Sequence, residues 1–385
     1  MAAKRLAESE LVSEIAIGGR DLAVATRVAE ETGPKATAVE IDATDEKKLA
    51  KLAAPYDLIV NTGGPDFLVA LPVTRAAITA GVPACDIAAD GPSLERALTL
   101  DRKAKDAEVT IVTGIGHIPG ISNLLMQHAA NQLDAVEDLQ LCVWWGLGGG
   151  NVAAFGDPEE MRRTGRVNAS WQTVLTWVTA PVRTYRDGHL VAVDPFEDAV
   201  EVALPRGGGT VSAVSIGSTE PITLPRGVPG VRSVSIRMAL LPPQLNGILQ
   251  EQTRQIAAGT SDAAKATMTF LDTITADPDR WLKSRTGAPS GFGMMATATG
   301  RKGRRKVRYS CWPAGPWEST VGPLTTAALR ILQGKIRLRG VVPPEAVFDP
   351  MPFLEEAARF RLKSIPGRLL DESVETEARG LRRVG

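Results

Sequence analysis

The first 120 residues alternate short runs of β-branched residues with longer segments in which apolar residues recur every three or four positions. This alternation is typical of parallel strands joined by helical crossovers. The pattern predicts strands at 14–17, 36–41, 58–60, 84–87 and 109–112, and helices at 22–31, 46–53, 71–80 and 93–106. We therefore expect an α/β fold with a doubly wound sheet, in which ligands bind beyond the carboxyl ends of the strands.

After residue 120 the strands follow one another with turns between them, which favours an α+β domain built on a mostly antiparallel sheet. The pattern predicts a helix at 121–132, strands at 139–145, 180–185, 199–204, 211–216 and 231–237, helices at 247–258 and 261–276, two strands flanking 299–306, and a helix at 323–333. We divide the chain into a nucleotide-binding domain at 1–120, an α+β substrate domain at 121–317, a C-terminal segment at 318–350 and a charged tail at 351–385.

Charge and cysteine content exclude several classes of protein. The 385 residues carry 44 Lys and Arg against 44 Asp and Glu, so no net positive charge is available to neutralise a phosphate backbone. No apolar run reaches the roughly 18–20 residues of a membrane span. Three widely spaced cysteines indicate neither a disulfide framework nor a cysteine zinc site. We expect a cytoplasmic protein that binds no nucleic acid, membrane or metal.

A basic run at 301–306, with the sequence RKGRRK, is the strongest local charge cluster. It has two interpretations: a patch for nucleic acid, or a solvated hairpin turn with Gly303 at its tip. We favour the hairpin turn, because the chain as a whole is electrically neutral.

A glycine pair ends the first predicted strand, where Gly18 and Gly19 precede Arg20. In a dinucleotide-binding fold the end of the second strand faces the adenosine ribose. An acidic residue there favours a free 2′-hydroxyl, whereas an arginine pairs with a 2′-phosphate. Gly19 and Arg20 therefore indicate NADP, with NAD as the alternative cofactor, although an ordinary exposed turn would also explain them.

Polar turns follow the next two strands of the pattern. Asp42 can accept a hydrogen bond from the adenine amino group, or it can cap the helix that follows. The second turn consists of Asn61, Thr62, Gly63, Gly64 and Pro65. Its two glycines allow a pyrophosphate or ribose to approach the backbone closely, so we favour a cofactor contact over a simple tight turn.

The loop between Gly114 and Gly120 follows the last predicted strand and leads into a helix whose free amides can hold an anion. His117 in this loop can hydrogen-bond a substrate or carry a proton near neutral pH, or it can simply cap the loop. We expect His117, Ser122 and Asn123 to contact the substrate.

The order of these segments resembles the saccharopine dehydrogenase-like oxidoreductases, the group of saccharopine reductase and carboxynorspermidine dehydrogenase. The resemblance rests on segments 18–20, 60–65, 71–73, 80–82, 119–125, 185–188, 218–221, 318–322 and 339–345. It implies a Rossmann-like NAD(P)-binding domain, a substrate and dimerisation domain, and a C-terminal segment that returns to the first domain. It also implies hydride transfer to or from a small secondary amine or imine, in a homodimer.

Two departures from the family matter. Saccharopine reductases look to carry an arginine after a Ser-Trp pair, whereas Gln172 follows Trp171 here, which argues against saccharopine as the substrate. The family begins with a strand and a G-x-G-x-x-G loop, whereas this sequence starts inside the helix that follows them. We therefore expect a sheet that lacks its first, central strand, and weak NADPH binding by this chain.

Two other functions stay open. A non-enzymatic scaffold or sensor would explain why the glycine loop is missing from the sequence. An enoyl reductase acting on lipid-like substrates would need an apolar channel, which Trp144, Trp145, Trp171 and Trp177 could line, although such residues more often belong to a core. The sequence identifies no catalytic acid or base.

Overall fold

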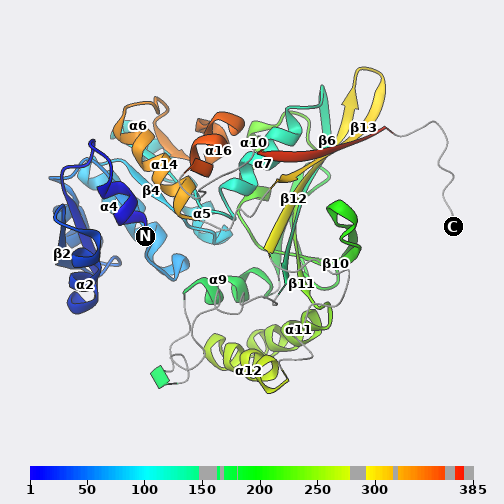
Figure 1. The fold of residues 1–385 in the computed structure, drawn as a ribbon, viewed down its shortest axis with the longest axis horizontal. Coiled ribbons are helices and arrows are strands. Elements are labelled where there is room, and N and C mark those ends of the chain that lie inside the picture. Colours follow the sequence, from blue (N-terminus) through cyan, green and yellow to red (C-terminus); the bar gives the residue numbers. More distant parts are fainter. Residues whose placement is uncertain are drawn as a thin grey trace. The chain divides into compact units, whose positions relative to one another are not determined.

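The computed structural model describes residues 1–146, 163–164, 169–179, 181–277, 292–314, 320–359 and 369–376. The chain divides into two compact units, which Figure 1 draws coloured along the sequence. Unit 1 consists of Met1–Leu124 and Ser319–Ser364, and unit 2 consists of Leu125–Glu318 and Ile365–Gly385. The chain passes from unit 1 to unit 2 within helix α7 (Ile121–Ala130).

Unit 1 contains two parallel sheets. Strands β1 (Ile15–Gly19) and β2 (Ala36–Glu40) form the smaller sheet. The larger sheet has the order β14-β5-β4-β3, formed by β3 (Ile59–Asn61), β4 (Ala84–Asp86), β5 (Thr110–Val112) and β14 (Gly340–Val342). No ladder joins β1 to β3, although every residue from 1 to 146 is described. The β-strands predicted for residues 1–120 are therefore confirmed, and they form two sheets rather than one.

Helices of unit 1 connect and cover these strands. They are α1 (Ala2–Ala7), α2 (Leu22–Thr32), α3 (Glu46–Ala53), α4 (Asp66–Ala80), α5 (Gly91–Leu98), α6 (Asp101–Asp106), α14 (Val321–Leu332), α15 (Pro344–Val347) and α16 (Pro350–Arg359). The single helix expected at 93–106 is two helices, because the amides of Thr99 and Leu100 bond three residues back and end α5. Helix α4 begins five residues earlier than expected, at Asp66, whose carboxylate accepts a bond from the amide of Phe67.

The core of unit 1 combines residues from both ends of the chain. One buried cluster consists of Ala77, Ala84, Ala97, Ala104, Val109, Ile111 and Val341. Val341 belongs to β14, which pairs in parallel with β5. Helix α14 buries Leu324, Ala327 and Ala328, which lie on one face at spacings of three and four. The C-terminal segment therefore completes the hydrophobic core of unit 1.

Unit 2 is built on a nine-stranded mixed sheet. Its strands are β6 (Ala135–Gly146), β7 (Val182–Arg186), β8 (His189–Val193), β9 (Val200–Ala203), β10 (Thr210–Ser215), β11 (Ser233–Leu241), β12 (Phe292–Lys302), β13 (Arg305–Pro313) and β15 (Leu370–Thr376). The order is β15-β13-β12-β6-β11-β10-β9, with β7 paired to β11 and β8. Only β6 and β11 pair in parallel among the described strands, so the expected α+β domain with a mostly antiparallel sheet is confirmed.

Described helices of unit 2 are α9 (Ala169–Trp177), α10 (Glu220–Gly227), α11 (Gln244–Ala257) and α12 (Ala263–Ala276), with a short 3-10 turn at Pro205–Gly207. Trp144, Trp171 and Trp177 are each at least nine-tenths buried, and Trp171 packs against Phe270 with ring centroids 5.1 Å apart. These three tryptophans are therefore core residues.

The basic run at 301–306 forms the tip of the β12–β13 hairpin, as expected. Gly303 has φ +58°, and its amide donates to Asp134 Oδ2 at 2.6 Å. The expected charged tail at 351–385 is in part ordered structure: α16 buries Phe353 and Leu354, and β15 pairs antiparallel with β13. Residues 360–368 and 377–385 of that range, and Glu318 and Ser319 of the family segments, lie outside the described residues.

Candidate functional site

The first group of predicted cofactor residues lies where β1 and β2 end. These strands run parallel, so Gly19 and Glu40 end them side by side, and the amide of Ile41 donates to the carbonyl of Gly19 at 3.0 Å. A Cβ on Gly18 would lie 2.8 Å from Ile41 Cγ2, so close packing requires a glycine there. Arg20 follows as an exposed side chain that forms no ion pair within the described chain.

The carboxylate of Asp42 interacts electrostatically with the guanidinium of Arg20. Its Oδ1 accepts bonds from the amide of Thr44 at 2.9 Å and from the Thr44 hydroxyl at 2.7 Å. These two hydrogen bonds, helped by the charge of Arg20, lower the pKa of Asp42, so it is ionised at neutral pH. The alternative that Asp42 caps helix α3 is wrong, because Asp45 performs that role by accepting from the amide of Lys48.

The second group lies in the turn after β3. Asn61 is buried, and its Oδ1 accepts a bond from the amide of Gly63 at 3.0 Å. Thr62, Gly63 and Gly64 are exposed, whereas Pro65 is half-buried and precedes α4. Asn61 therefore shapes the turn, and the residues that follow it present their backbone to solvent.

Two buried carboxylates that the sequence analysis missed fix the neighbouring loops. Asp66 Oδ2 accepts from the amides of Ala89 and Asp90 at 2.6 and 2.9 Å. Asp86 Oδ1 accepts from the amide of Ala88, the hydroxyl of Thr113 and the amide of Gly114, at 2.8–3.0 Å. Burial raises the pKa of Asp86, although the backbone hydrogen bonds oppose the shift. The loops after β3, β4 and β5 are thereby tied to one another.

The loop after β5 is closed on itself. Gly114 and Gly120 have φ +75° and +123°, a region that favours glycine. The amide of Gly116 donates to the carbonyl of Pro119 at 2.9 Å, and a Cβ on Gly120 would lie 2.2 Å from the oxygen of Gly116. Glycines in this loop therefore serve its own compact geometry.

The expectation that α7 begins with free amides is wrong for its first turn. The amide of Gly120 donates to Asn123 Oδ1 at 2.9 Å, that of Ile121 to the Gly116 carbonyl, and that of Ser122 to the His117 carbonyl. Because the loop itself supplies these acceptors, the amides are not available to an anion.

Of the three residues expected to contact a substrate, two are buried. Ser122 is 0% and Asn123 is 1% exposed, and Asn123 Nδ2 donates to Glu345 Oε2 at 3.0 Å. Asn123 thus ties the loop to helix α15 of the C-terminal segment. His117 is half-buried and is the most exposed of the three side chains.

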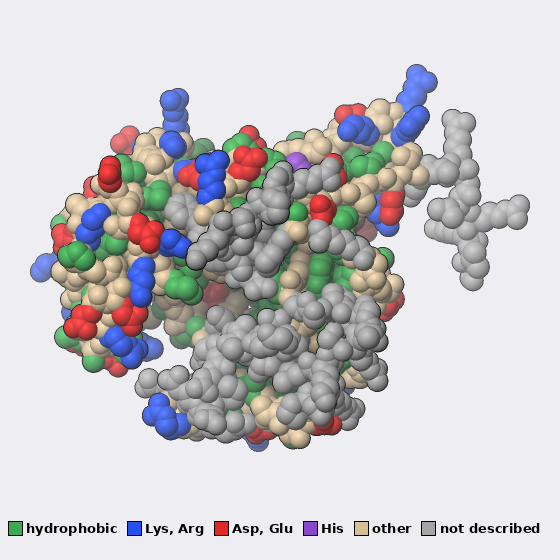
Figure 2. Space-filling model, in the orientation of Figure 1, with side chains coloured by type: hydrophobic (Ala, Val, Ile, Leu, Met, Phe, Trp, Pro, Cys, Tyr) green, Lys and Arg blue, Asp and Glu red, His purple; other side chains and the backbone are tan. Residues whose placement is uncertain are grey.

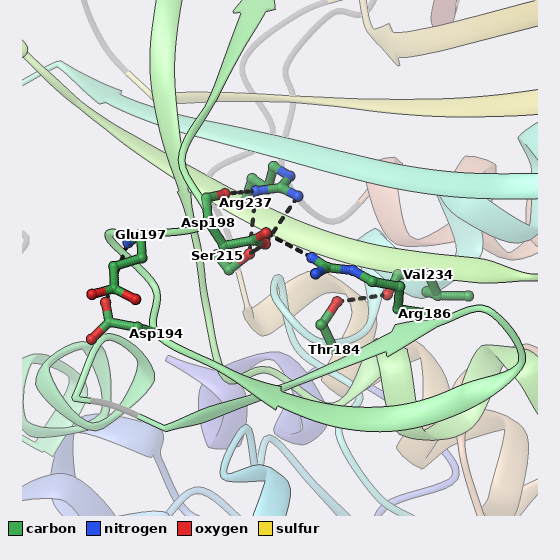
Figure 3. Close-up of polar contacts among 8 residues, drawn as sticks. All are labelled: Thr184, Arg186, Asp194, Glu197, Asp198, Ser215, Val234 and Arg237. Carbon is green, nitrogen blue, oxygen red and sulfur yellow. Dashed lines mark hydrogen bonds and ion pairs between the residues drawn. The ribbon is translucent and has the colours of Figure 1, made fainter.

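A polar cluster in unit 2 joins β10 and β11 to the turn before β9 (Figure 3). Asp198 accepts from Arg186 at 2.6 Å, from Ser215 at 2.6 Å and from Arg237 at 3.1 Å. Burial alone would raise the pKa of Asp198, but the hydrogen bonds from Ser215 and Arg186, with the charge of Arg237, hold it below its ordinary value. The cluster anchors this turn to the sheet.

No group of three His, Cys, Asp or Glu residues in the described ranges is arranged to hold a metal ion. Cys85, Cys142 and Cys311 are free and buried, and burial raises the pKa of each thiol. No helix of the described chain is long and apolar enough to cross a membrane.

Comparison with known proteins finds a family match for the region that contains the predicted cofactor residues at the ends of β1, β2 and β3. Residues 1–112 match the family described as "Saccharopine dehydrogenase NADP binding domain". The resemblance seen in the sequence is thereby confirmed for the NADP-binding domain, which contains Arg20, Asp42 and the turn 61–65 but not His117, Ser122 or Asn123.

One solved structure extends the likeness beyond this domain at the level of the fold. Apo saccharopine dehydrogenase (L-Glu forming) from Saccharomyces cerevisiae superposes with a TM-score of 0.63 at 14% identity, over 97% of each chain. GenD2 of gentamicin A biosynthesis gives a TM-score of 0.38 at 13% identity, over 93% of this chain and 89% of its own. An oxidoreductase from Thermotoga maritima gives a TM-score of 0.35 at 12% identity, over 90% of this chain and 85% of its own.

Proposed function

We propose that this chain is an NADP-dependent oxidoreductase that transfers a hydride to or from a small secondary amine or imine. The observation that carries the cofactor assignment is Arg20, an exposed guanidinium without an ion pair in the described chain, at the end of β1 in a domain of an NADP-binding family. A free guanidinium suits a 2′-phosphate, because its planar donors match phosphate oxygens. We include the homodimer and the cytoplasmic location in the proposal.

The residues at the ends of β1, β2 and β3 fit the adenosine part of such a cofactor. Arg20 would hold the 2′-phosphate, and the ionised Asp42 would accept the adenine amino group at the oxygen that Thr44 leaves open. Thr62, Gly63 and Gly64 would offer backbone groups to the ribose or pyrophosphate. The nucleotide, when bound, supplies or accepts the hydride, and the protein supplies orientation.

On the substrate side, His117 is the residue that we expect to act. It is half-buried in the loop after β5, which the hydrogen bonds of Asp86 and Asn123 hold in one conformation. An imidazole can hydrogen-bond an amine nitrogen or move a proton at it. We assign Ser122 and Asn123 the role of shaping this loop.

We further infer that a strand belongs between β1 and β3. The support is that both are parallel strands with one unpaired edge, and a doubly wound sheet of this order places its first strand between them.

Steady-state kinetics test the proposed function. NADPH oxidation would be followed with imines formed from small amines and α-keto acids. Arg20→Ala should raise the KM for NADPH by about ten- to a hundredfold and leave kcat little changed, since the phosphate contact lies far from the hydride. Arg27→Ala, which removes an exposed arginine of α2, should change neither constant. Cofactor binding without turnover of any imine would favour the scaffold or sensor.

A further inference from the structure

His117 is held by backbone hydrogen bonds between its loop and the first turn of α7. The amide of Ser122 donates to the His117 carbonyl at 3.2 Å, and the amide of Ile121 donates to the Gly116 carbonyl at 3.1 Å. Gly116 and Gly120 also form an isolated β-bridge. The position of the His117 backbone therefore follows the position of residues 120–123.

Asn123 is the side chain that fixes this first turn. Its Oδ1 accepts a bond from the amide of Gly120 at 2.9 Å, and its Nδ2 donates to Glu345 Oε2 at 3.0 Å. Asn123 is 1% exposed, so the loss of either bond would leave a buried polar group unsatisfied. One side chain thus bonds the His117 loop on one side and the C-terminal segment on the other.

The two neighbours of Asn123 allow only one orientation of its amide group. A backbone amide only donates and therefore requires Oδ1, whereas a carboxylate only accepts and therefore requires Nδ2. A flipped amide would place Nδ2 against the amide of Gly120 and Oδ1 against the oxygen of Glu345. The carboxylate of Glu345 therefore selects the orientation in which Asn123 accepts from Gly120.

Glu345 is itself placed by a well-anchored part of the C-terminal segment. Strand β14 pairs with β5, and the amide of Thr113 donates to the Val342 carbonyl at 3.1 Å. Pro343 and Pro344 come next, and their rings fix φ at the two residues before Glu345. The half-buried side chain of Glu345 thus extends from a backbone that has little freedom to move.

We propose that Glu345 is a positioning residue for His117 and that it acts through Asn123. Its carboxylate sets the orientation of the Asn123 amide, that amide holds Gly120, and the first turn of α7 holds the His117 carbonyl. A residue 222 positions after Asn123 thereby governs where the imidazole lies when a substrate binds. This inference rests on the proposed role of His117, and it gives the C-terminal segment a part in the reaction beyond its packing in unit 1.

Exchanging the donor and the acceptor between positions 123 and 345 tests this role. Asn123→Asp keeps an acceptor for Gly120 but places two carboxylates in contact, so it should displace the loop. We expect kcat to fall roughly ten- to a hundredfold, with the KM for NADPH little changed. Glu345→Gln keeps an acceptor for Asn123 Nδ2 and should lower kcat less. The double variant Asn123→Asp/Glu345→Gln again places a donor opposite an acceptor, and it should regain most of the lost kcat.

A spectroscopic measurement follows His117 without turnover. The chain has three histidines, His117, His128 and His189 (purple where they are visible in Figure 2), and His117→Gln assigns the ring signal of His117 in the NMR spectrum. This signal should shift in Asn123→Asp and return in the double variant. Asn131→Asp keeps the acceptor of an exposed hydrogen bond within α7 and its C-terminal end, so this matched control should leave the signal and kcat unchanged.

The outcomes separate this inference from the proposed function. If Asn123→Asp lowers the melting temperature but leaves the His117 signal and kcat as in the parent, the contact is merely structural and the positioning role is overturned. A double variant that recovers neither the signal nor kcat would also overturn it. A parent that reduces no imine would contradict the proposed function instead, because the His117 signal reports the position of the ring in every variant without turnover.

Discussion

Replacing Asp198 with alanine should destabilise unit 2 strongly. The side chains of Asp198 and Arg237 are 18% and 9% exposed, so the substitution leaves a buried guanidinium without its carboxylate. Removing one partner of a buried ion pair costs about 3–5 kcal/mol in free energy of unfolding. Because Arg237 keeps bonds to the Asp198 carbonyl and to Ser215, we expect the lower end, about 3 kcal/mol.

The pH dependence of this effect has a definite sign. The pKa of Asp198 is lowered in the folded state, so its stabilisation is present above the unfolded value of about 3.9 and is lost as the pH falls through the folded pKa. Asp198→Asn keeps an acceptor for Ser215 and Arg237 but has no charge. It should lose less stability than Asp198→Ala and should lack this acid-dependent component.

Urea unfolding at pH 7 and at pH 3 measures both quantities. Glu137→Ala is the matched control, because its ion pair with Arg301 is 3.9 Å long and exposed, and such pairs contribute about 0–1 kcal/mol. If Asp198→Ala loses no more stability than Glu137→Ala, the reasoning about the buried pair is refuted.

Two further predictions concern unit 1. Gly120→Ala should lower the free energy of unfolding by at least about 2 kcal/mol in thermal denaturation, because a Cβ there meets both a positive φ and the Gly116 oxygen. Gly334→Ala, also in unit 1, meets only a positive φ and should lose about 1 kcal/mol. Equal losses for the two variants would contradict the clash. The pKa of Asp86 is raised in the folded state, so its contribution to stability falls as the pH rises above the unfolded value of about 3.9. Asp86→Asn should therefore make the melting temperature depend less on pH in that range. The same pH dependence in the variant and the parent would refute this.

The five strands within residues 1–120 were predictable because each is a short apolar run bounded by turn residues, and their boundaries are within two residues of those in the structure. Strand β14, the remaining strand of unit 1, was not predicted. Strand β15 was not predictable from its own residues. It is acidic and has no apolar alternation, and it exists because it pairs with β13, more than fifty residues away in sequence. Such pairing is a tertiary effect that overrides local propensity.

The candidate site shows the same division. The position of Arg20 and Asp42 just beyond the ends of β1 and β2 was predictable from the strand pattern, and their contact with a cofactor stays a prediction. The buried roles of Asn123 and Asp86 were not, since they depend on partners such as Glu345 and Gly114 that other loops supply. A local pattern shows which residue types follow a strand, but not whether another loop already uses their hydrogen bonds.

Isothermal titration calorimetry with NADPH and with NADH tests the central claim most directly. A charge-assisted contact between Arg20 and the 2′-phosphate contributes about 1.5–3 kcal/mol. The parent chain should therefore bind NADPH about ten- to a hundredfold more tightly than NADH, whatever the absolute affinity, and Arg20→Ala should bring the ratio close to one while Arg27→Ala preserves it. Equal affinities of the parent for the two nucleotides would contradict the assignment of Arg20 and the NADP-dependent function that rests on it.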